Sequence, residues 1–269
     1  MNYNKKRVSQ GCFALISLYA LVSLTPAFAS SVSGGAMTIN INGTDLAAAF
    51  THNFDPSRPS FYLEEYFTAS QAASRISNQL LEEHIIPDPM PISGSGLEFT
   101  VNTSSTSGQN QETNLSFDPS DLTGTATGGI GLGGAMRFRL NKSFTINPVT
   151  GEEEGNRTVT AYYSMEYDAS KADNAAGHSG WMLVNHNSFT ADVFYLDNVV
   201  TDLTTDILSL SGELALAGGF DHLGGQHGAI VGDFNFQTTV VPVPAAIWLF
   251  ASAFTGLFAA RLVANRSVA

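Results

Sequence analysis

Histidines are the residues with the widest chemical range in this chain, because imidazole can bind a metal ion or transfer a proton near neutral pH. The six are His52, His84, His178, His186, His222 and His227. A catalytic zinc site usually takes a close pair such as HExxH and a third ligand. No pair here has that spacing, although Asp221 beside His222 leaves a small metal-binding loop as an alternative. We predict no metal site and interpret residues 221–227 as a solvated hairpin loop.

Two glycine-containing motifs resemble catalytic or cofactor-binding patterns. Residues 129–134 (GIGLGG) fit GxGxxG, which needs a helix directly afterwards to hold a pyrophosphate. The next residues, 135–140, alternate like a strand instead. Residues 177–180 (GHSG) begin like the G-x-S-x-G turn of a nucleophilic serine, but Trp181 replaces the last glycine. Neither motif predicts a catalytic residue or a cofactor.

Acidic residues suggest two further chemistries. Glycoside hydrolysis needs two carboxylates that face each other. The adjacent pairs Glu64/Glu65 and Glu82/Glu83 do not meet this need, because chain neighbours point in different directions. Calcium binding is favoured in general terms by aspartates in predicted loops, although no EF-hand pattern is present. These aspartates are Asp118, Asp121, Asp168 and Asp173.

Aromatic residues leave two interpretations open. In a β-rich domain they are usually core residues or cross-strand pairs. Alternatively, one set could form a surface on which a sugar ring stacks. Its members are Tyr162, Tyr163, Trp181 and Tyr195.

The pattern that would position these residues is mainly that of β-strands. Alternating apolar and polar residues, separated by turn clusters, predict strands over residues 36–42, 97–101, 114–117, 128–141, 144–146, 157–167, 181–184, 189–196, 206–216 and 229–241. One amphipathic helix is predicted over residues 68–83. We therefore predict a mainly β, antiparallel β-sandwich or jelly-roll-like domain with that helix, as a single domain over residues 30–240.

The charge of this domain restricts its partners. Residues 30–240 contain all 24 acidic residues and seven of the twelve basic ones, which gives a net charge of −17. Such a surface repels the phosphates of nucleic acids and anionic lipids. It suits a solvated protein whose partners are neutral glycans, cations or basic molecules, and it excludes a nucleic-acid-binding protein.

The first 29 residues have the pattern of a secretory signal peptide. Three basic residues precede residue 8, an apolar run follows over residues 12–24, and Ala27 and Ala29 form a small-x-small cleavage site. Cleavage is predicted between Ala29 and Ser30. Because Cys12 is the only cysteine, the processed chain contains no disulfide and no thiol nucleophile.

The last 29 residues have three parts in order. The short motif Val241, Pro242, Val243 and Pro244 comes first. A predicted transmembrane helix follows over residues 245–262, and residues 261–269 form a basic tail. By the positive-inside rule, Arg261 and Arg266 place the C-terminus in the cytoplasm and the preceding domain outside.

This order resembles the PEP-CTERM sorting signal of Gram-negative bacteria, which an exosortase recognises. The matching residues are 241–250 (VPVPAAIWLF), and they are followed by the arginines. The chain departs from the signal in two places: Val243 replaces the usual acidic residue, and the basic tail has two arginines rather than a cluster. The resemblance covers only about thirty residues. It implies signal peptidase and exosortase as partners, export across the inner membrane, an anchor that is at least transient, and a setting of exopolysaccharide and biofilm.

We therefore expect a non-enzymatic protein of the cell surface or extracellular matrix, without catalytic residues, cofactors or metal ligands. An alternative is a carbohydrate-binding or calcium-dependent recognition module. A hydrolase of extracellular polysaccharide is a third hypothesis, and no set of catalytic residues in the sequence supports it.

Overall fold

The computed structural model describes most of the predicted domain. The described residues are 29–51, 55–74, 90–104, 111–141, 145–146, 148–149, 153–154, 158–187 and 190–242. Ser30–Val241 form one compact unit, and of the second unit (Met1–Ala29 with Pro242–Ala269) only Ala29 and Pro242 are described. The predicted transmembrane helix and almost all of the signal peptide thus lie outside the described residues. Within the described part, no helix has the length and apolar character needed to cross a bilayer.

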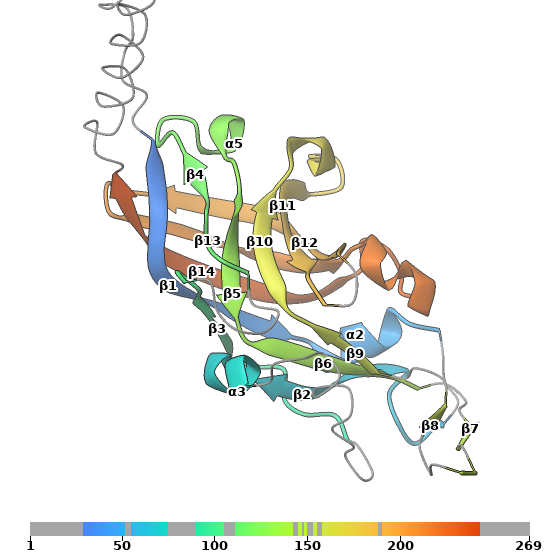
Figure 1. Ribbon diagram of the computed structural model, residues 1–269. Coiled ribbons are helices and arrows are strands. Elements are labelled where there is room, and N and C mark those ends of the chain that lie inside the picture. Colours follow the sequence, from blue (N-terminus) through green and yellow to red (C-terminus); the bar gives the residue numbers. More distant parts are fainter. Residues whose placement is uncertain are drawn as a thin grey trace, which may run out of the picture. The chain divides into compact units, whose positions relative to one another are not determined.

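Strands dominate the described residues, with a few short helices (Figure 1). The strands are β1 (Ser30–Ile41), β2 (Phe61–Phe67), β3 (Leu97–Val101), β4 (Ser116–Phe117), β5 (Gly129–Gly133), β6 (Ala135–Leu140), β7 (Thr145–Ile146), β8 (Glu153–Glu154), β9 (Thr158–Ala161), β10 (Tyr163–Tyr167), β11 (His178–Asn185), β12 (Ala191–Leu203), β13 (Ile207–Leu216) and β14 (Ile230–Pro242). The helices are α2 (Gly43–Ala48), α3 (Ala69–Ser74), α5 (Leu122–Thr125) and the 3-10 helices η1 (Ala169–Lys171) and η2 (Gly218–Leu223).

Eight strands form a closed sheet. Their order is β1-β3-β5-β10-β11-β12-β13-β14, and β14 pairs again with β1, while the short β4 pairs with the start of β1. The closing pair is antiparallel, because its contacts run in opposite directions along the two strands. Ser31 Oγ lies 3.5 Å from the Val241 carbonyl oxygen, and Asn42 N–H donates to the Val231 carbonyl oxygen over 2.8 Å.

A smaller sheet continues from the closed one. It has the order β2-β6-β9, and all of its pairs are antiparallel. Only Gly134 separates β5 from β6, and only Tyr162 separates β9 from β10, so the chain passes directly from one sheet to the other twice. Gly134 has a φ of +131°, and a Cβ there would lie 2.9 Å from the Phe99 ring. Glycine is therefore required at this bend.

One large hydrophobic cluster fills the interior of the closed sheet. Phe220 from η2 lies in an aromatic group within it. Its ring centroid lies 5.5–6.0 Å from those of four other phenylalanines, which come from the segment after α2 and from β2, β6 and β12. These are Phe50, Phe61, Phe138 and Phe194. The short η2 helix is thus fixed to both sheets by apolar packing.

The prediction of a mainly β, antiparallel domain is confirmed, but its arrangement differs from a sandwich of two open sheets. The difference arises because β14 pairs with β1, two segments about two hundred residues apart in the chain. The predicted strand over residues 97–101 is found with those bounds as β3. Others are longer than predicted: β1 begins at Ser30 rather than at residue 36.

The structure differs from the prediction around residues 61–83. Strand β2 was not predicted, because its residues 61–64 are all buried and therefore show no alternation of apolar and polar residues. The predicted helix over residues 68–83 is present in its first part as α3 (Ala69–Ser74). Its remainder, from residue 75, lies outside the described residues.

Replacing Phe220 by alanine should lower the free energy of unfolding by about 3–5 kcal/mol, because the cavity would open inside the aromatic group. Ile207→Ala is the control, since Ile207 is 40% exposed and should cost less than about 1 kcal/mol. Urea unfolding of both variants measures the difference. Equal losses in the two variants would contradict the central position of Phe220.

Candidate functional site

The aromatic residues predicted as a core or as a sugar-stacking face are buried. Tyr162 and Tyr163 are 0% exposed, Trp181 is 1% exposed and Tyr195 is 8% exposed. The core interpretation is therefore confirmed. The shared stacking face is wrong, because the side chains of all four residues are buried. Only Tyr195 borders a pocket on the surface.

The loop aspartates are engaged in local turns. Asp118 Oδ1 accepts hydrogen bonds from the amide and hydroxyl of Ser120 at 2.8 and 2.7 Å. Asp168 accepts from the Ser170 amide at 2.8 Å. These bonds to serine lower the pKa of both carboxyls. Among the described residues, no group of three or more metal-binding side chains comes together.

The glycine motifs take the positions that the sequence analysis predicted. Gly129–Gly133 form strand β5, and a strand, β6, follows rather than a helix. In the second motif, the hydroxyl of Ser179 donates to the Leu196 carbonyl oxygen over 2.6 Å, within the pairing of β11 with β12. This serine therefore has a structural partner on the neighbouring strand.

Glu64 and Glu65 meet two arginines of β6 in a buried ion cluster. Glu64 Oε1 accepts from Arg139 Nε at 2.8 Å, and Glu64 Oε2 lies 3.1 Å from Arg137 Nε. Glu65 Oε2 lies 2.8 Å from Arg137 Nη2. Because each carboxylate faces a guanidinium, the two acids stabilise opposite charges and do not form a general acid–base pair. No sequence pattern indicated this cluster, since it depends on the register of β2 against β6.

Ser164, Glu166 and His186 form a second cluster, on β10 and at the end of β11. The Ser164 hydroxyl donates to Glu166 Oε1 over 2.5 Å and lies 2.7 Å from His186 Nε2. Glu166 Oε1 lies 3.4 Å from the same nitrogen. A catalytic triad needs serine and carboxylate on opposite imidazole nitrogens, with the serine proton directed to histidine. This arrangement is instead a polar network, and its hydrogen bond from His186 lowers the pKa of Glu166.

Tyr195 stands at the centre of a third cluster, outside the closed sheet. Its ring centroid lies 4.4 Å from that of His178 and 5.5 Å from that of His227. His178 Nδ1 lies 2.8 Å from Asp197 Oδ1, which fixes the imidazole on strand β11 against the next strand, β12. Burial raises the pKa of Asp197, and the hydrogen bond from His178 opposes this shift.

A pocket of about 470 Å³ lies beside Tyr195. It is bordered by η1, by the start of β12, by η2 and by the loop after η2. The lining residues are Lys171, Thr190, Ala191, Asp192, Tyr195, Gly218, Gly219, His222 and His227. Lys171 Nζ lies 2.9 Å from Asp192 Oδ2, and this contact raises the pKa of Lys171. His227 Nδ1 lies 3.5 Å from Asp221 Oδ1 at the rim.

His178, Tyr195, His222 and His227 were all noticed as candidates in the sequence, but only His222 and His227 were considered together, in the loop over residues 221–227. Lys171 and Asp192 were missed, because neither lies in a motif. The pairing of His178 with Asp197 in the register of β11 and β12 is what assembles the site. A long-range strand register leaves no signal at short spacing in the sequence.

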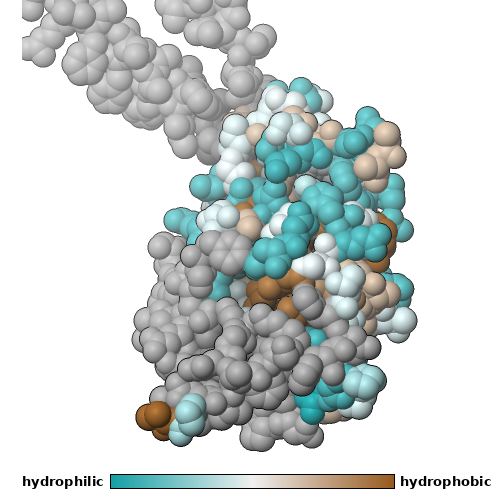
Figure 2. Space-filling view, turned by 90° about the vertical axis from the view of Figure 1, so that its right-hand side faces the viewer, coloured by the Kyte–Doolittle hydropathy of each residue, from teal (hydrophilic) through white to brown (hydrophobic). Residues whose placement is uncertain are grey.

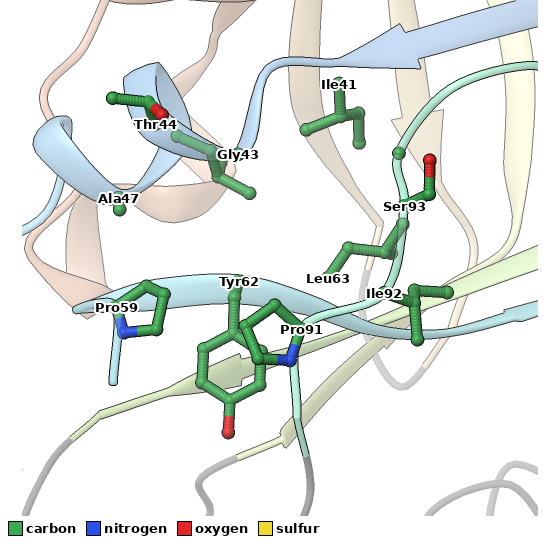
Figure 3. A pocket seen from close by; sticks show the side chains of 12 residues that line it. Ile41, Gly43, Thr44, Ala47, Pro59, Tyr62, Leu63, Pro91, Ile92 and Ser93 are labelled. Atoms are coloured by element: carbon green, nitrogen blue, oxygen red, sulfur yellow. The ribbon is translucent and has the colours of Figure 1, made fainter. Parts of the chain in front are cut away.

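A second pocket, of about 530 Å³, is mostly apolar (Figure 3). It lies between α2, β2 and the extended residues 91–94. This segment is held at both ends, since Ile92 N–H donates to the Leu63 carbonyl oxygen and Ile41 N–H to the Gly94 carbonyl oxygen. Among the described residues that line it, Tyr62 is the only one with a titratable side chain.

Hydrophilic side chains cover most of the described surface on the face seen in Figure 2. Hydrophobic side chains lie near the centre of this face, and others are visible at its right edge and at the lower left. This distribution agrees with the strongly acidic composition of the domain.

The predicted processing residues lie at the two ends of the compact unit. Ala29 and Ser30 stand at the beginning of β1, and Val241 and Pro242 end β14. The other predicted processing and orientation residues lie outside the described residues. They are Ala27, Val243, Pro244, Arg261 and Arg266.

A scan of protein-family models finds none that matches the chain, and searches of curated proteins and of solved structures find no match either.

Glu64→Gln should lower the free energy of unfolding by about 3–5 kcal/mol, because it leaves an excess positive charge in a buried cluster. The matched control is Glu98→Gln, which removes an exposed carboxylate from β3 and should change stability by about 0.5 kcal/mol or less. Urea unfolding at neutral pH measures both. A Glu64→Gln variant as stable as the control would show that the cluster contributes nothing to the fold.

The ionised carboxylate of Glu166 should stabilise the folded state at neutral pH, and this contribution should be lost at acid pH. Its folded-state pKa is lowered below the ordinary value of 4.5, so its contribution is present above pH 4.5 and is lost as the pH falls through the lowered pKa. Glu166→Gln should therefore melt below the wild type at pH 6, and the difference between the two melting temperatures should shrink as the pH falls below 4.5. Thermal unfolding across this range tests the prediction. A constant difference in melting temperature would contradict it.

Proposed function

We propose that this chain is a non-enzymatic protein of the cell surface or extracellular matrix, exported by its signal peptide and processed at its PEP-CTERM-like tail by an exosortase. One observation carries the proposal. The compact unit, Ser30–Val241, begins and ends within one residue of the two predicted processing regions. The bounds of this unit come from its own packing, whereas the processing regions come from short sequence motifs.

The ends of the unit support removal of both terminal segments. β1 begins at Ser30, directly after the predicted signal-peptidase site, and β14 ends at Pro242, inside the sorting motif. Cleavage at either place would remove none of the fourteen strands of the described residues. The processed domain would keep the complete closed sheet, including its pairing of β1 with β14.

A non-enzymatic role is supported by how three reactive side chains of the described residues are used. Glu64 neutralises buried arginines, Ser164 donates its proton to a carboxylate, and Ser179 bonds to a backbone carbonyl. Each of these groups holds the fold together and is not directed at an open cavity. The net charge of −17 in residues 30–240 also favours a hydrated domain, which suits an extracellular matrix of glycans.

The test is the mass of both termini of the protein produced in a bacterium with an exosortase and in a strain that lacks it. We expect an N-terminus at Ser30 in both strains. We expect a C-terminus between residues 242 and 245 only where the exosortase is present. The intact C-terminal residue Ala269 in both strains would overturn the sorting proposal.

A double variant, Pro242→Ala with Pro244→Ala, should keep its intact tail in the exosortase strain. Pro119→Ala, which changes a proline in the turn after β4, is the control and should be processed like the wild type. Processing of the double variant at the same position would show that the motif is not what the enzyme recognises.

A further inference from the structure

We propose that the pocket beside Tyr195 binds a neutral polyhydroxylated ligand, such as a hexose unit of a glycan. This inference goes beyond the sorting proposal and does not depend on it. It rests on the packing beneath Tyr195, on the mixture of donors and acceptors around the pocket, and on its charge.

The base of the pocket is held firmly in place. Tyr195 belongs to a small hydrophobic cluster on the outer surface of the closed sheet, with residues from β11 and β13 and the residue that precedes η2. Its other members are Met182, Val184, Ala215 and Ala217. The His178 imidazole packs against the Tyr195 ring and is itself fixed by the buried Asp197 carboxylate. The ring therefore presents its hydroxyl in one position, which reduces the ordering cost of binding.

The walls offer hydrogen-bond donors and acceptors together. The Lys171 ammonium is a donor, the Asp192 carboxylate is an acceptor, and the imidazole of His227 can supply either role. Burial raises the pKa of Tyr195, so its hydroxyl keeps its proton. That hydroxyl has no hydrogen-bond partner among the described residues. A sugar hydroxyl suits such walls, because each one both donates and accepts.

The charge of the pocket favours a neutral ligand over an ion. Lys171 and Asp192, the two oppositely charged side chains that line the pocket, pair with each other, so neither sign dominates the walls. An anionic sugar would also meet the long-range repulsion of a domain with a net charge of −17. A cation would be repelled by the Lys171 ammonium. The described residues also contain no cluster of three or more metal-binding side chains.

The pocket has room for a sugar. Its volume of about 470 Å³ falls within the range of about 300–1,000 Å³ that is usual for small-molecule sites. One side is formed by Gly218, where an added Cβ would meet only the Asp221 carboxylate, at 3.6 Å. A large side chain at this position would therefore fill the pocket without disturbing the core.

The experiment measures binding of cellobiose, N,N′-diacetylchitobiose and digalacturonate to the purified full-length protein by saturation-transfer NMR. We expect binding of at least one neutral disaccharide and weaker or no binding of the anionic one. Tyr195→Phe keeps the ring in its hydrophobic cluster and should weaken the affinity about three- to tenfold, the effect of one lost hydrogen bond. Gly218→Leu should abolish binding.

Asp202→Asn is the matched control, because it removes an exposed carboxylate from the same strand, β12, outside the pocket. It should bind like the wild type. The proposal is overturned if no neutral disaccharide binds, if digalacturonate binds more tightly, or if Gly218→Leu binds like the wild type while remaining folded. None of these results would change the masses of the termini, so a failure here is distinguishable from a failure of the sorting proposal.

Discussion

The pairing of β14 with β1 is the interaction on which the rest of this structure depends. It joins the last strand of the compact unit to the first, and it converts a row of eight strands into a closed sheet. Closure removes two sheet edges, which would otherwise expose unpaired backbone groups to other chains. It also brings Ser31 beside Val241, so the unit begins and ends at the same place. Such a unit can lose segments at both ends and keep every strand pair, as processing at two termini would require.

The closed sheet also determines what the polar residues can do. Its interior is filled by one hydrophobic cluster, so a binding site has to lie outside the sheet or at the smaller sheet. In the smaller sheet, the acids and arginines of β2 and β6 neutralise one another in a buried cluster. Outside the closed sheet, β11 and β12 carry His178, Tyr195 and Asp197 in one layer, and η2 adds the wall of a pocket. Phe220 anchors η2 in the core, so apolar packing inside the sheet positions a polar surface outside it.

Sequence patterns predicted the parts of this fold that depend on local periodicity. β3 alternates along its length because one face is buried and the other is exposed, whereas β13 alternates in burial only over its first residues. Both strands were predicted within a residue of their bounds. β2 was missed because both of its faces are covered. Other parts of the fold depend on contacts between residues that are 19 to about 210 positions apart in the chain. They are the closure of the sheet, the ion pair of Glu64 with Arg139 and the contact of His178 with Asp197. Such contacts are set by strand register and leave no pattern at short spacing. The pocket beside Tyr195 therefore could not be found from the sequence, although both of its histidines, His222 and His227, were noticed.

Native-state hydrogen exchange tests most directly whether the sheet closes through β1 and β14. In a closed sheet, the backbone amides of both strands are paired, and they should exchange as slowly as those of β12 and β13, in one cooperative opening. Val231 and Asn42 mark the pairing at the far end of the two strands, and Ser31 and Val241 mark it at the near end. Protection across all four strands with a single opening free energy is the predicted result. Fast exchange along β1 and β14 while β12 and β13 stay protected would show an open sheet. It would contradict the claim that strand pairing joins the two ends of the compact unit.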